Sequence, residues 1–382
     1  MYFLDGALAK QIVNRTMKII GHNINVMNKH GVILGSGESQ RIGEVHEGAL
    51  LAISQQRTVE ISHASEGTLH GVKAGINLPL HYKGDIIGVI GITGDPTELG
   101  HYGELLKMTA EIIVEQANSI EQAQWQYRQK EELIIDLIKS DGPFSAHQRN
   151  WASQLSINLD TPRVAAIIQV RADEEETSAN SMLKQVLHLL ENPSRGNLVA
   201  MTSMTELVIL KPAFLDGKAW DAELESQRID QLITRLPIEL RSRLKVSLGH
   251  FFPKPQEINR SYQTALETLS IGSHMQPELS KYLYEDFSLL VLLSSLKGNW
   301  RGKELISPYQ SLIDADKNGQ LSKTLSCYLQ NFGDQQQCAN ALFIHRNTLR
   351  YRIEKIEKIT GVSMQQLDGL LQLYLGQVLL TQ

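Results

Sequence analysis

The segment 335–361 has the residue types and spacing of a DNA-reading element. Leu349, Ile353 and Ile356 recur at intervals of four and three, which predicts a helix with one buried stripe. A shorter helical pattern over 336–342 precedes it, and a tight apolar turn separates the two. Two short helices joined in this way are typical of a helix-turn-helix, whose second helix enters the major groove of DNA.

Polar and basic side chains fall on the opposite face of that second helix and on its flanks. Arginine and asparagine can form paired hydrogen bonds with base edges, and cations can bind phosphates. Asp334 is placed to cap the first helix, and either His345 or Asn347 the second. The side chains that we expect to contact DNA are His345, Arg346, Asn347, Thr348, Arg350, Tyr351 and Arg352. The competing interpretation is a solvated basic helix without a nucleic-acid partner.

Charge favours a contact with DNA that is confined to this segment. Between residues 335 and 361 five lysine and arginine residues face two glutamates, whereas the whole chain has a net charge of -5. An acidic body with one basic segment directs contact with a polyanion to that segment. Because one recognition helix covers only a few base pairs, we expect a homodimer that presents two of them to promoter DNA.

A second group of polar residues lies near the start of the chain, where the loop 35–43 is rich in small residues. Arg41 offers a planar fork for a carboxylate, and the amides at the start of the helix expected over Glu44 to Gln56 add positive potential. Ser36 and His46 can donate hydrogen bonds to oxygen. These features predict a site for a small anion. The alternative is a surface loop with a solvated arginine.

The residues around this loop predict a small α/β sensor domain with an antiparallel sheet. A helical pattern covers Leu8 to Ile20, and glycine-containing turns at His30-Gly31 and Lys83-Gly84 separate strand-like segments. The expected strands are Ile24–Met27, Val32–Gly35, Gly75–Tyr82 and Asp85–Ile92. Asn77, on the third of them, brings an amide side chain suited to hydroxyl groups.

A long helical pattern without proline runs from Tyr102 to about Ser140. Ten positions in it are spaced alternately by four and three residues, and all but Gln124 and Glu131 are apolar or aromatic. The ten are Leu106, Ala110, Ile113, Ala117, Ile120, Gln124, Tyr127, Glu131, Ile134 and Ile138. This spacing is typical of a coiled-coil seam. The alternative is a helix that packs first on the sensor and then on the next domain.

The residues from Pro162 to Asp286 predict a domain with the ferredoxin-like order of strands and helices, a scaffold also used by nucleotidyl cyclases. The expected elements are Arg163–Val170, Ser181–Glu191, Leu198–Ser203, Leu207–Leu210, Arg228–Leu236, Lys245–Gly249 and Glu257–Ile271. Cyclases place a glycine pair and acidic residues in the hairpin turn, because phosphate must approach the backbone and metals need carboxylates. The turn here reads Met204-Thr205-Glu206, so we expect a catalytically silent domain.

The composition is that of a globular protein of two or three domains, with 382 residues, 42% hydrophobic and 21% charged. Nucleotide-binding and metallopeptidase motifs are absent and the histidines are scattered, so we expect no catalytic site, metal or cofactor. Cys327 and Cys338 are interpreted as small buried residues in a reducing compartment. Without a basic leader or a long apolar segment, we expect a cytoplasmic protein with no membrane contact.

Several stretches of the sequence carry a resemblance to a known family. NINVMNKHGVILGSGESQRIGEVHEGAL and LHGVKAGINLPLHYKGDIIGVIGITGDP closely resemble the sugar-diacid recognition domain of the carbohydrate diacid regulators, which are bacterial transcription activators. The run ALFIHRNTLRYRI resembles the helix-turn-helix of the nucleoid protein Fis and of the purine-catabolism regulators. The similarity extends through MTAEIIVEQ and VSLGHFF, so it covers nearly the whole chain.

This resemblance implies a ligand of the glucarate, galactarate or glycerate class and control of genes for its uptake and catabolism. The contacts that it favours are Ser36, Gly37, Arg41, His46, Gly75 and Asn77, with the glycines allowing close approach of the backbone. A diacid has two carboxylates, so the second must bind backbone amides or the helix end. The monoacid glycerate fits the single arginine more easily.

We therefore expect a multidomain α+β protein that acts as a ligand-responsive transcriptional regulator, with activation the better guess, and not as an enzyme. Its expected parts are a sensor over 1–102, a connecting and dimerisation helix over 103–142, a silent cyclase-like domain over 143–290 and an all-α DNA-binding domain over 291–382, with the helix-turn-helix at 335–361. Two alternatives are a nucleotide cyclase or phosphodiesterase that uses the middle domain, and an interaction adaptor whose basic helix binds protein.

Overall fold

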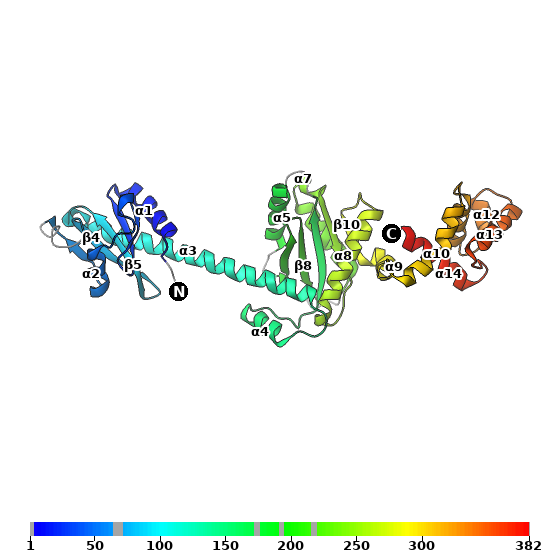
Figure 1. Ribbon diagram of the computed structural model, residues 1–382, viewed down its shortest axis with the longest axis horizontal. Coiled ribbons are helices and arrows are strands. Elements are labelled where there is room, and N and C mark those ends of the chain that lie inside the picture. Colours follow the sequence, from blue (N-terminus) through cyan, green and yellow to red (C-terminus); the bar gives the residue numbers. More distant parts are fainter. Residues whose placement is uncertain (1–3, 64–71, 172–175, 191–194, 215–219, 382) are drawn as a thin grey trace. The chain divides into compact units, whose positions relative to one another are not determined.

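The computed structural model describes residues 4–63, 72–171, 176–190, 195–214 and 220–381 (Figure 1). The chain divides into two compact units, Met1–Arg128 and Gln129–Gln382. Each unit contains one five-stranded sheet with helices, and the carboxy-terminal part is all helical. The multidomain α+β class expected from the sequence is confirmed.

The first unit is built on an antiparallel sheet with the strand order β2-β1-β5-β4-β3. The strands are β1 (Ile24–Asn28), β2 (Ile33–Ser36), β3 (Val59–Ile61), β4 (Gly75–Tyr82) and β5 (Asp85–Thr93). The four expected strands are present, whereas β3 was missed because so short a strand shows no periodicity. Lys83 and Gly84, with φ of 52° and 93°, form the tight turn between β4 and β5.

Helices cover both faces of this sheet. They are α1 (Gly6–Ile20), α2 (Glu47–Gln55) and the first part of α3 (Pro96–Lys139). Ile76 and Leu78 of β4 point into a core shared with α1 and α3. Met27 of β1 and Val89 of β5 point to the other face, where they pack with Ala49 of α2. Because side chains alternate along each strand, the apolar face that packs on α1 and α3 is separate from the face that packs on α2.

The helix α3 contributes to the core of both units. Five of the ten seam positions, Leu106, Ala110, Ile113, Ile134 and Ile138, are buried in one core or the other. Both ends of α3 therefore pack on a domain of the same chain, as the alternative to a continuous coiled coil requires. Between them Ile120 and Trp125 are 59% and 55% exposed. This middle stretch is open to a helix from another molecule.

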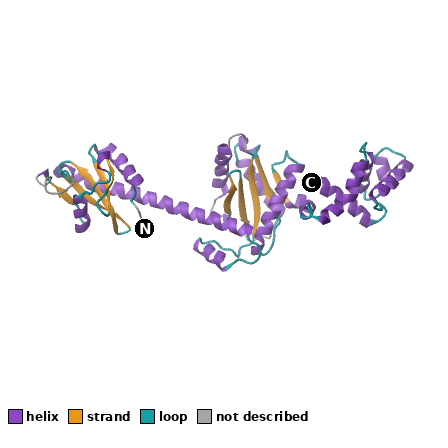
Figure 2. Cartoon of the chain, in the orientation of Figure 1, coloured by secondary structure: helices purple, strands orange, loops and turns teal. Residues whose placement is uncertain are grey.

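The second unit begins with a sheet of order β10-β9-β6-β8-β7, in which the ferredoxin-like order is extended by β10, parallel to β9. The strands are β6 (Arg163–Val170), β7 (Leu198–Ser203), β8 (Glu206–Pro212), β9 (Leu244–Leu248) and β10 (Lys281–Leu283). The helices are α4 (Ala146–Gln154), α5 (Glu176–Leu190), α6 (Ala222–Arg235), α7 (Ile238–Arg241), α8 (Ile258–Met275) and α9 (Tyr284–Ser294). Figure 2 shows helices on both faces of this sheet.

Each face of the second sheet has its own core. Ile168 of β6 and Ile209 of β8 pack with residues of α5 and α6 on one face. Ala165 and Leu210 of the same strands pack with α8 and the end of α3 on the other. The helix α6 begins earlier than expected, because Asp221 caps it by accepting hydrogen bonds from two of its first amides.

The hairpin β7–β8 closes with a two-residue turn at Met204-Thr205, across which Ser203 pairs with Glu206. The turn contains no glycine. The carboxylate of Glu206 accepts a hydrogen bond from the hydroxyl of Thr202 at 2.6 Å. The bare backbone and paired acidic groups with which cyclases bind phosphate and metal are therefore missing from this turn.

The carboxy-terminal part is a bundle of short helices, α10 (Trp300–Ala315), α11 (Gln320–Gln330), α12 (Gln335–Ala341), α13 (Arg346–Thr360) and α14 (Leu367–Thr381). Cys327 and Cys338 are buried in its core as free thiols, as expected from the sequence. Burial raises the pKa of the Cys338 thiol to about 12. Among the described residues no helix is long and apolar enough to cross a membrane.

Candidate DNA-reading helix and anion site

The helices α12 and α13 form the helix-turn-helix, and side chains fix both of its starts. Asp334 caps α12 by accepting the amide of Gln337 at 2.9 Å. His345 caps α13 through its Nδ1 atom, which accepts the amide of Asn347 at 3.3 Å. Of the two caps considered for α13, His345 is therefore the one used. The side chain of Asn347 is left for other contacts.

The buried stripe of α13 sets the direction in which its polar face points. Leu349, Ile353 and Ile356 are 1%, 3% and 0% exposed and pack in the core of the bundle. Ala339 of α12 is also buried there. The periodicity expected from the sequence is confirmed, and the opposite face of α13 is turned to solvent.

The exposed face of α13 and its start carry six of the seven side chains expected to read DNA. Those six are His345, Arg346, Asn347, Thr348, Arg350 and Tyr351. Tyr351 is 63% exposed. The Nε atom of Arg350 lies 3.8 Å from an oxygen of Glu354, and both side chains are solvated. Such a pair is worth little, so the guanidinium group can exchange it for a base or a phosphate.

Arg352 differs from the other six because its side chain is hydrogen-bonded to another helix. Its guanidinium group donates hydrogen bonds to the hydroxyl of Thr324 at 3.2 Å and to Oε1 of Gln320 at 3.1 Å. Both partners belong to α11. Arg352 therefore holds the recognition helix against α11, a contact that the spacing of basic residues could not reveal.

Residues of the anion site expected near the start of the chain lie on the α2 face of the first sheet. Arg41 ends the single turn η1 (Ser39–Arg41) and is only 8% exposed. His46 caps α2, where its Nδ1 atom accepts the amide of Ala49 at 3.2 Å. A neutral imidazole that accepts at Nδ1 carries its proton on Nε2, which makes that atom a donor. The surface loop with a solvated arginine is not what the structure shows.

His46 is held neutral at ordinary pH. Burial lowers the pKa of its imidazole to about 4, and the positive charge of Arg41 adds to this effect. The guanidinium group of Arg41, whose Nε atom lies 3.9 Å from a carboxylate oxygen of the exposed Glu44, is thus close to a neutral donor. This combination suits a carboxylate that carries a neighbouring hydroxyl group.

A row of polar residues crosses the sheet beneath α2. Ser36, Asn25, Gly91 and Asn77 are register partners in turn across β2, β1, β5 and β4. A Cβ atom at Gly91 would lie 3.0 Å from Oδ1 of Asn77. Among the described residues, the buried Oδ1 atom of Asn77 has no hydrogen-bond partner. Gly91 thus lets the backbone of β5 lie close to a buried acceptor, and buried acceptors are rarely left unsatisfied.

His46 and Asn77 approach each other at Gly48, the second residue of α2. A Cβ atom at Gly48 would lie 3.0 Å from both Nδ2 of Asn77 and Cε1 of His46. Arg41, His46 and Asn77 are thus the expected residues that the structure gathers on this face. Sequence reasoning missed Asn25, Gly48 and Gly91. Of these three, Asn25 gave a signal in the sequence, because it is a polar residue at the second position of the mainly apolar strand β1.

Three other expected contacts have roles within the protein. The hydroxyl of Ser36 donates to Oδ1 of Asn25 at 2.6 Å and accepts the amide of Glu38. A Cβ atom at Gly37 would lie 2.3 Å from Oδ1 of Asn23, and one at Gly75 would lie 2.0 Å from the carbonyl oxygen of Ile92. Packing inside the domain therefore accounts for both glycines without any ligand.

Three family models match successive parts of the chain. Residues 4–137 match the family model "Putative sugar diacid recognition", residues 141–271 a "GGDEF-like domain" and residues 321–377 the "PucR C-terminal helix-turn-helix domain". The carbohydrate diacid regulator of Escherichia coli strain K12 is 45% identical over 98% of this chain and 97% of its own length. The chain belongs to the carbohydrate diacid regulator family.

More distant relatives match the chain over all or part of its length. A protein of Haemophilus influenzae strain Rd is 38% identical over 98% of this chain and 99% of its own. The purine catabolism regulatory protein of Bacillus subtilis strain 168 is 25% identical over 39% of this chain and 28% of its own. Membership of the family, together with the helix-turn-helix, makes the chain a DNA-binding transcriptional regulator.

We expect the first unit of this regulator to lose stability as the pH falls. The pKa of His46 is about 4 in the folded chain, below the ordinary value of about 6.5 for the unfolded chain. The unfolded state therefore binds more protons between these values, and the free energy of unfolding falls there as the pH falls. Hydrogen exchange of amides in β1, β4 and β5 should show a loss of about 1 kcal/mol between about pH 7.5 and pH 5.5.

The matched variant for this measurement is His46→Asn, whose side-chain oxygen can cap α2 but which cannot titrate. It should lack most of the pH-dependent loss. An equal loss in the wild type and in the variant would show that another group is responsible.

Proposed function

We propose that this regulator binds a small hydroxy acid in its first unit and that the acid changes the affinity of α13 for promoter DNA. The effector class is glucarate, galactarate or glycerate, and the controlled genes serve uptake and catabolism of these acids, with activation as the direction. The observation that carries the proposal is the 45% identity, over 98% of the chain, to a protein named as a carbohydrate diacid regulator.

The geometry beneath α2 supports an acid as the effector. Arg41 supplies a planar cation for a carboxylate, and Nε2 of His46 supplies a neutral donor. Oδ1 of Asn77 is a buried acceptor that suits a hydroxyl group. A carboxylate with a neighbouring hydroxyl group has an anion for Arg41, an oxygen that can accept from His46 and a hydroxyl that can donate to Asn77. All three acids of the proposed class contain it.

Two recognition helices are needed for a specific operator, so we infer that the chain works as a homodimer. The middle of α3 supports this proposal, because Ile120 and Trp125 are exposed there on a helix that both units share. A helix common to both cores also offers a route by which an effector can favour one arrangement of the readers. Such coupling requires different affinities of the effector for the two arrangements.

The middle domain acts in this proposal as a structural link and not as an enzyme. The turn at Met204-Thr205 supports this assignment, because it has no glycine pair to admit a phosphate. A nucleotide turnover assay with the full chain tests the cyclase alternative directly. The proposed site of action is the cytoplasm, where the promoter lies.

The decisive experiment measures operator binding by fluorescence anisotropy while glucarate, galactarate or glycerate is added to the full-length protein. At least one of these acids should change operator affinity by about 5- to 150-fold, the usual range of allosteric coupling. Indifference to all three acids would remove the proposed effector class. Deletion of residues 335–382 should abolish salt-sensitive binding to DNA, and binding that survives the deletion would place the DNA reader elsewhere. Absence of salt-sensitive DNA binding by the full-length protein would favour the adaptor alternative.

A further inference from the structure

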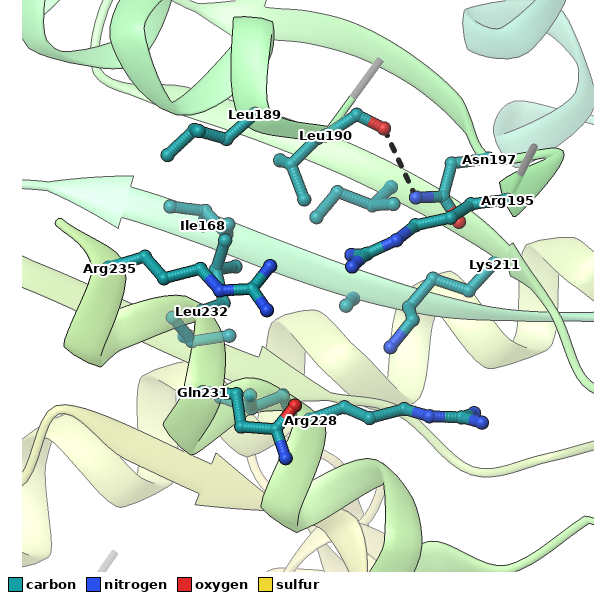
Figure 3. Close-up of a pocket in the computed structure, with 14 residues that line it drawn as sticks. Ile168, Leu189, Leu190, Arg195, Asn197, Lys211, Arg228, Gln231, Leu232 and Arg235 are labelled. Atoms are coloured by element: carbon teal, nitrogen blue, oxygen red, sulfur yellow. Dashed lines mark hydrogen bonds between the residues drawn. The ribbon is translucent and has the colours of Figure 1, made fainter. Parts of the chain in front are cut away.

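The second unit contains a basic pocket that belongs neither to the DNA reader nor to the anion site. Its volume is about 330 Å³, and it lies between α5 and α6 on the sheet face that these helices cover (Figure 3). Four cationic side chains line it, namely Arg195, Lys211, Arg228 and Arg235. So dense a group of cations around one hollow attracts an anion.

The four cations are neutralised only in part. Glu225, a buried residue of α6, accepts hydrogen bonds from both Lys211 and Arg228. Arg195 and Arg235 have no ion-pair partner in the part of the chain that the structure describes. In Figure 3 their guanidinium groups point into the pocket from opposite sides. Among the described residues, one carboxylate against four cations leaves three positive charges in excess around the pocket.

Burial makes the positive charge of Lys211 costly in the absence of a ligand. Burial lowers the pKa of Lys211, although the carboxylate of Glu225 opposes the shift. The guanidinium groups of Arg228 and Arg195 lower the pKa of Lys211 further. An anion in the pocket would offset this repulsion, as cations inside clefts commonly require.

The floor of the pocket is apolar and belongs to the sheet. Ile168, Ile209 and Val246 come from three neighbouring strands and close its base, where they are at most 2% exposed. Beside them Leu189 of α5 is 41% exposed and supplies the accessible apolar surface against which a flat ring can lie. At the rim, Nδ2 of Asn197 donates to the carbonyl oxygen of Leu190 at 3.2 Å, which leaves its Oδ1 atom as an acceptor. A ligand that combines a flat polar ring with negative charge would use the floor, the amide and the cations together.

This pocket is separate from the place where cyclases bind their substrate. Lys211 lies near the end of β8, far along the strand from the turn at Met204-Thr205. Arg195 lies shortly before Leu198, the first residue of β7, and so at the same end of the hairpin as Lys211. A volume of about 330 Å³ is at the lower end of the usual range for small-molecule sites, so the pocket admits a metabolite but not a DNA duplex.

We propose that this pocket binds a nucleoside phosphate with at least two negative charges. Arg195, Lys211 and Arg235 hold the phosphate groups, and the base lies against the accessible apolar surface with Asn197 at its edge. The site is a second effector site, and it does not depend on the acid assigned to the first unit.

Isothermal titration calorimetry of the full-length chain tests this proposal with three probes of graded chemistry. A panel of nucleoside diphosphates supplies both ring and charge, inorganic pyrophosphate supplies charge alone, and adenosine supplies a ring alone. At least one nucleoside diphosphate should bind about tenfold or more tightly than pyrophosphate, and adenosine should bind more weakly than either. Binding of pyrophosphate as tight as that of every nucleotide would overturn the role of the ring. No binding by any nucleotide would overturn the site.

The variant Arg195→Ala/Arg235→Ala removes the two exposed cations and should weaken nucleotide binding by about tenfold or more. Its control is Lys184→Ala/Lys254→Ala, which removes two exposed cations outside the pocket lining and should leave binding unchanged. Both variants should retain the melting temperature and the operator affinity of the wild type. Equal nucleotide affinity in the two variants would overturn the proposal.

Discussion

Replacing Asn347 and Arg350 together by alanine should weaken specific operator binding by about 100-fold or more, because each can form a bidentate contact worth about 1 to 3 kcal/mol. Both side chains are exposed on the face of α13 opposite its buried stripe. A homodimer loses each contact twice, which increases the effect. Gel-shift titration against the operator and against a scrambled duplex measures the loss of specificity.

The matched control for this prediction is Lys323→Ala, which removes an exposed cation of α11 in the same helical bundle. It should leave the ratio of specific to nonspecific affinity unchanged. If the double variant of α13 keeps the wild-type ratio, then α13 is not the element that reads bases.

Replacing Arg41 by alanine should weaken binding of the acid effector by about 100-fold or more. The guanidinium group is buried, and hydrogen bonds between charged groups contribute about 1.5 to 3 kcal/mol each. A carboxylate that enters the site without this cation would be buried with no counter-charge. Calorimetric titration of the effector, together with the effector-dependent change in operator affinity, measures both consequences.

Two further variants separate loss of the contact from loss of the fold. Arg41→Lys keeps the charge but not the planar fork, so it should bind with an intermediate affinity. Arg57→Ala removes an exposed cation beyond the end of α2 and should bind as the wild type does. Wild-type effector affinity in a folded Arg41→Ala protein would show that the acid binds elsewhere.

The long periodic elements of this regulator could be predicted from the sequence. The stripe of Leu349, Ile353 and Ile356 placed α13 within a residue or two, because an apolar period near 3.6 residues that is sustained over several turns is typical of a helix and not of a strand. The strands β4 and β5 were equally clear, since Lys83-Gly84 marks the turn between them. The short elements β3 and η1 carry too few residues to show a period.

The candidate sites were predictable only where a residue type alone suggested a role. Arg41 and His46 stand out as a cation and a donor beside a helix start. Gly91 does not, because its importance depends on the register that places it between Asn25 and Asn77. Register and distant pairing, which also join Arg352 to α11, come from tertiary packing and leave no local trace in the sequence.

The turn of the helix-turn-helix shows a further limit of local rules. Phe343 has a φ of 54° and is 95% exposed, although left-handed backbone costs a bulky residue about 1 to 2 kcal/mol. Propensity would place glycine at this position. The chain instead presents an aromatic ring next to the start of the recognition helix.

The polar row beneath α2 determines which of several chemically similar acids the proposed effector site would accept. A buried amide whose acceptor is unsatisfied, as in Asn77, penalises any molecule that enters without a group to fill that bond. Deoxy analogues should therefore be excluded far more strongly than homologues that are one carbon longer. Stereoisomers that turn a single hydroxyl away from the sheet should be rejected for the same reason.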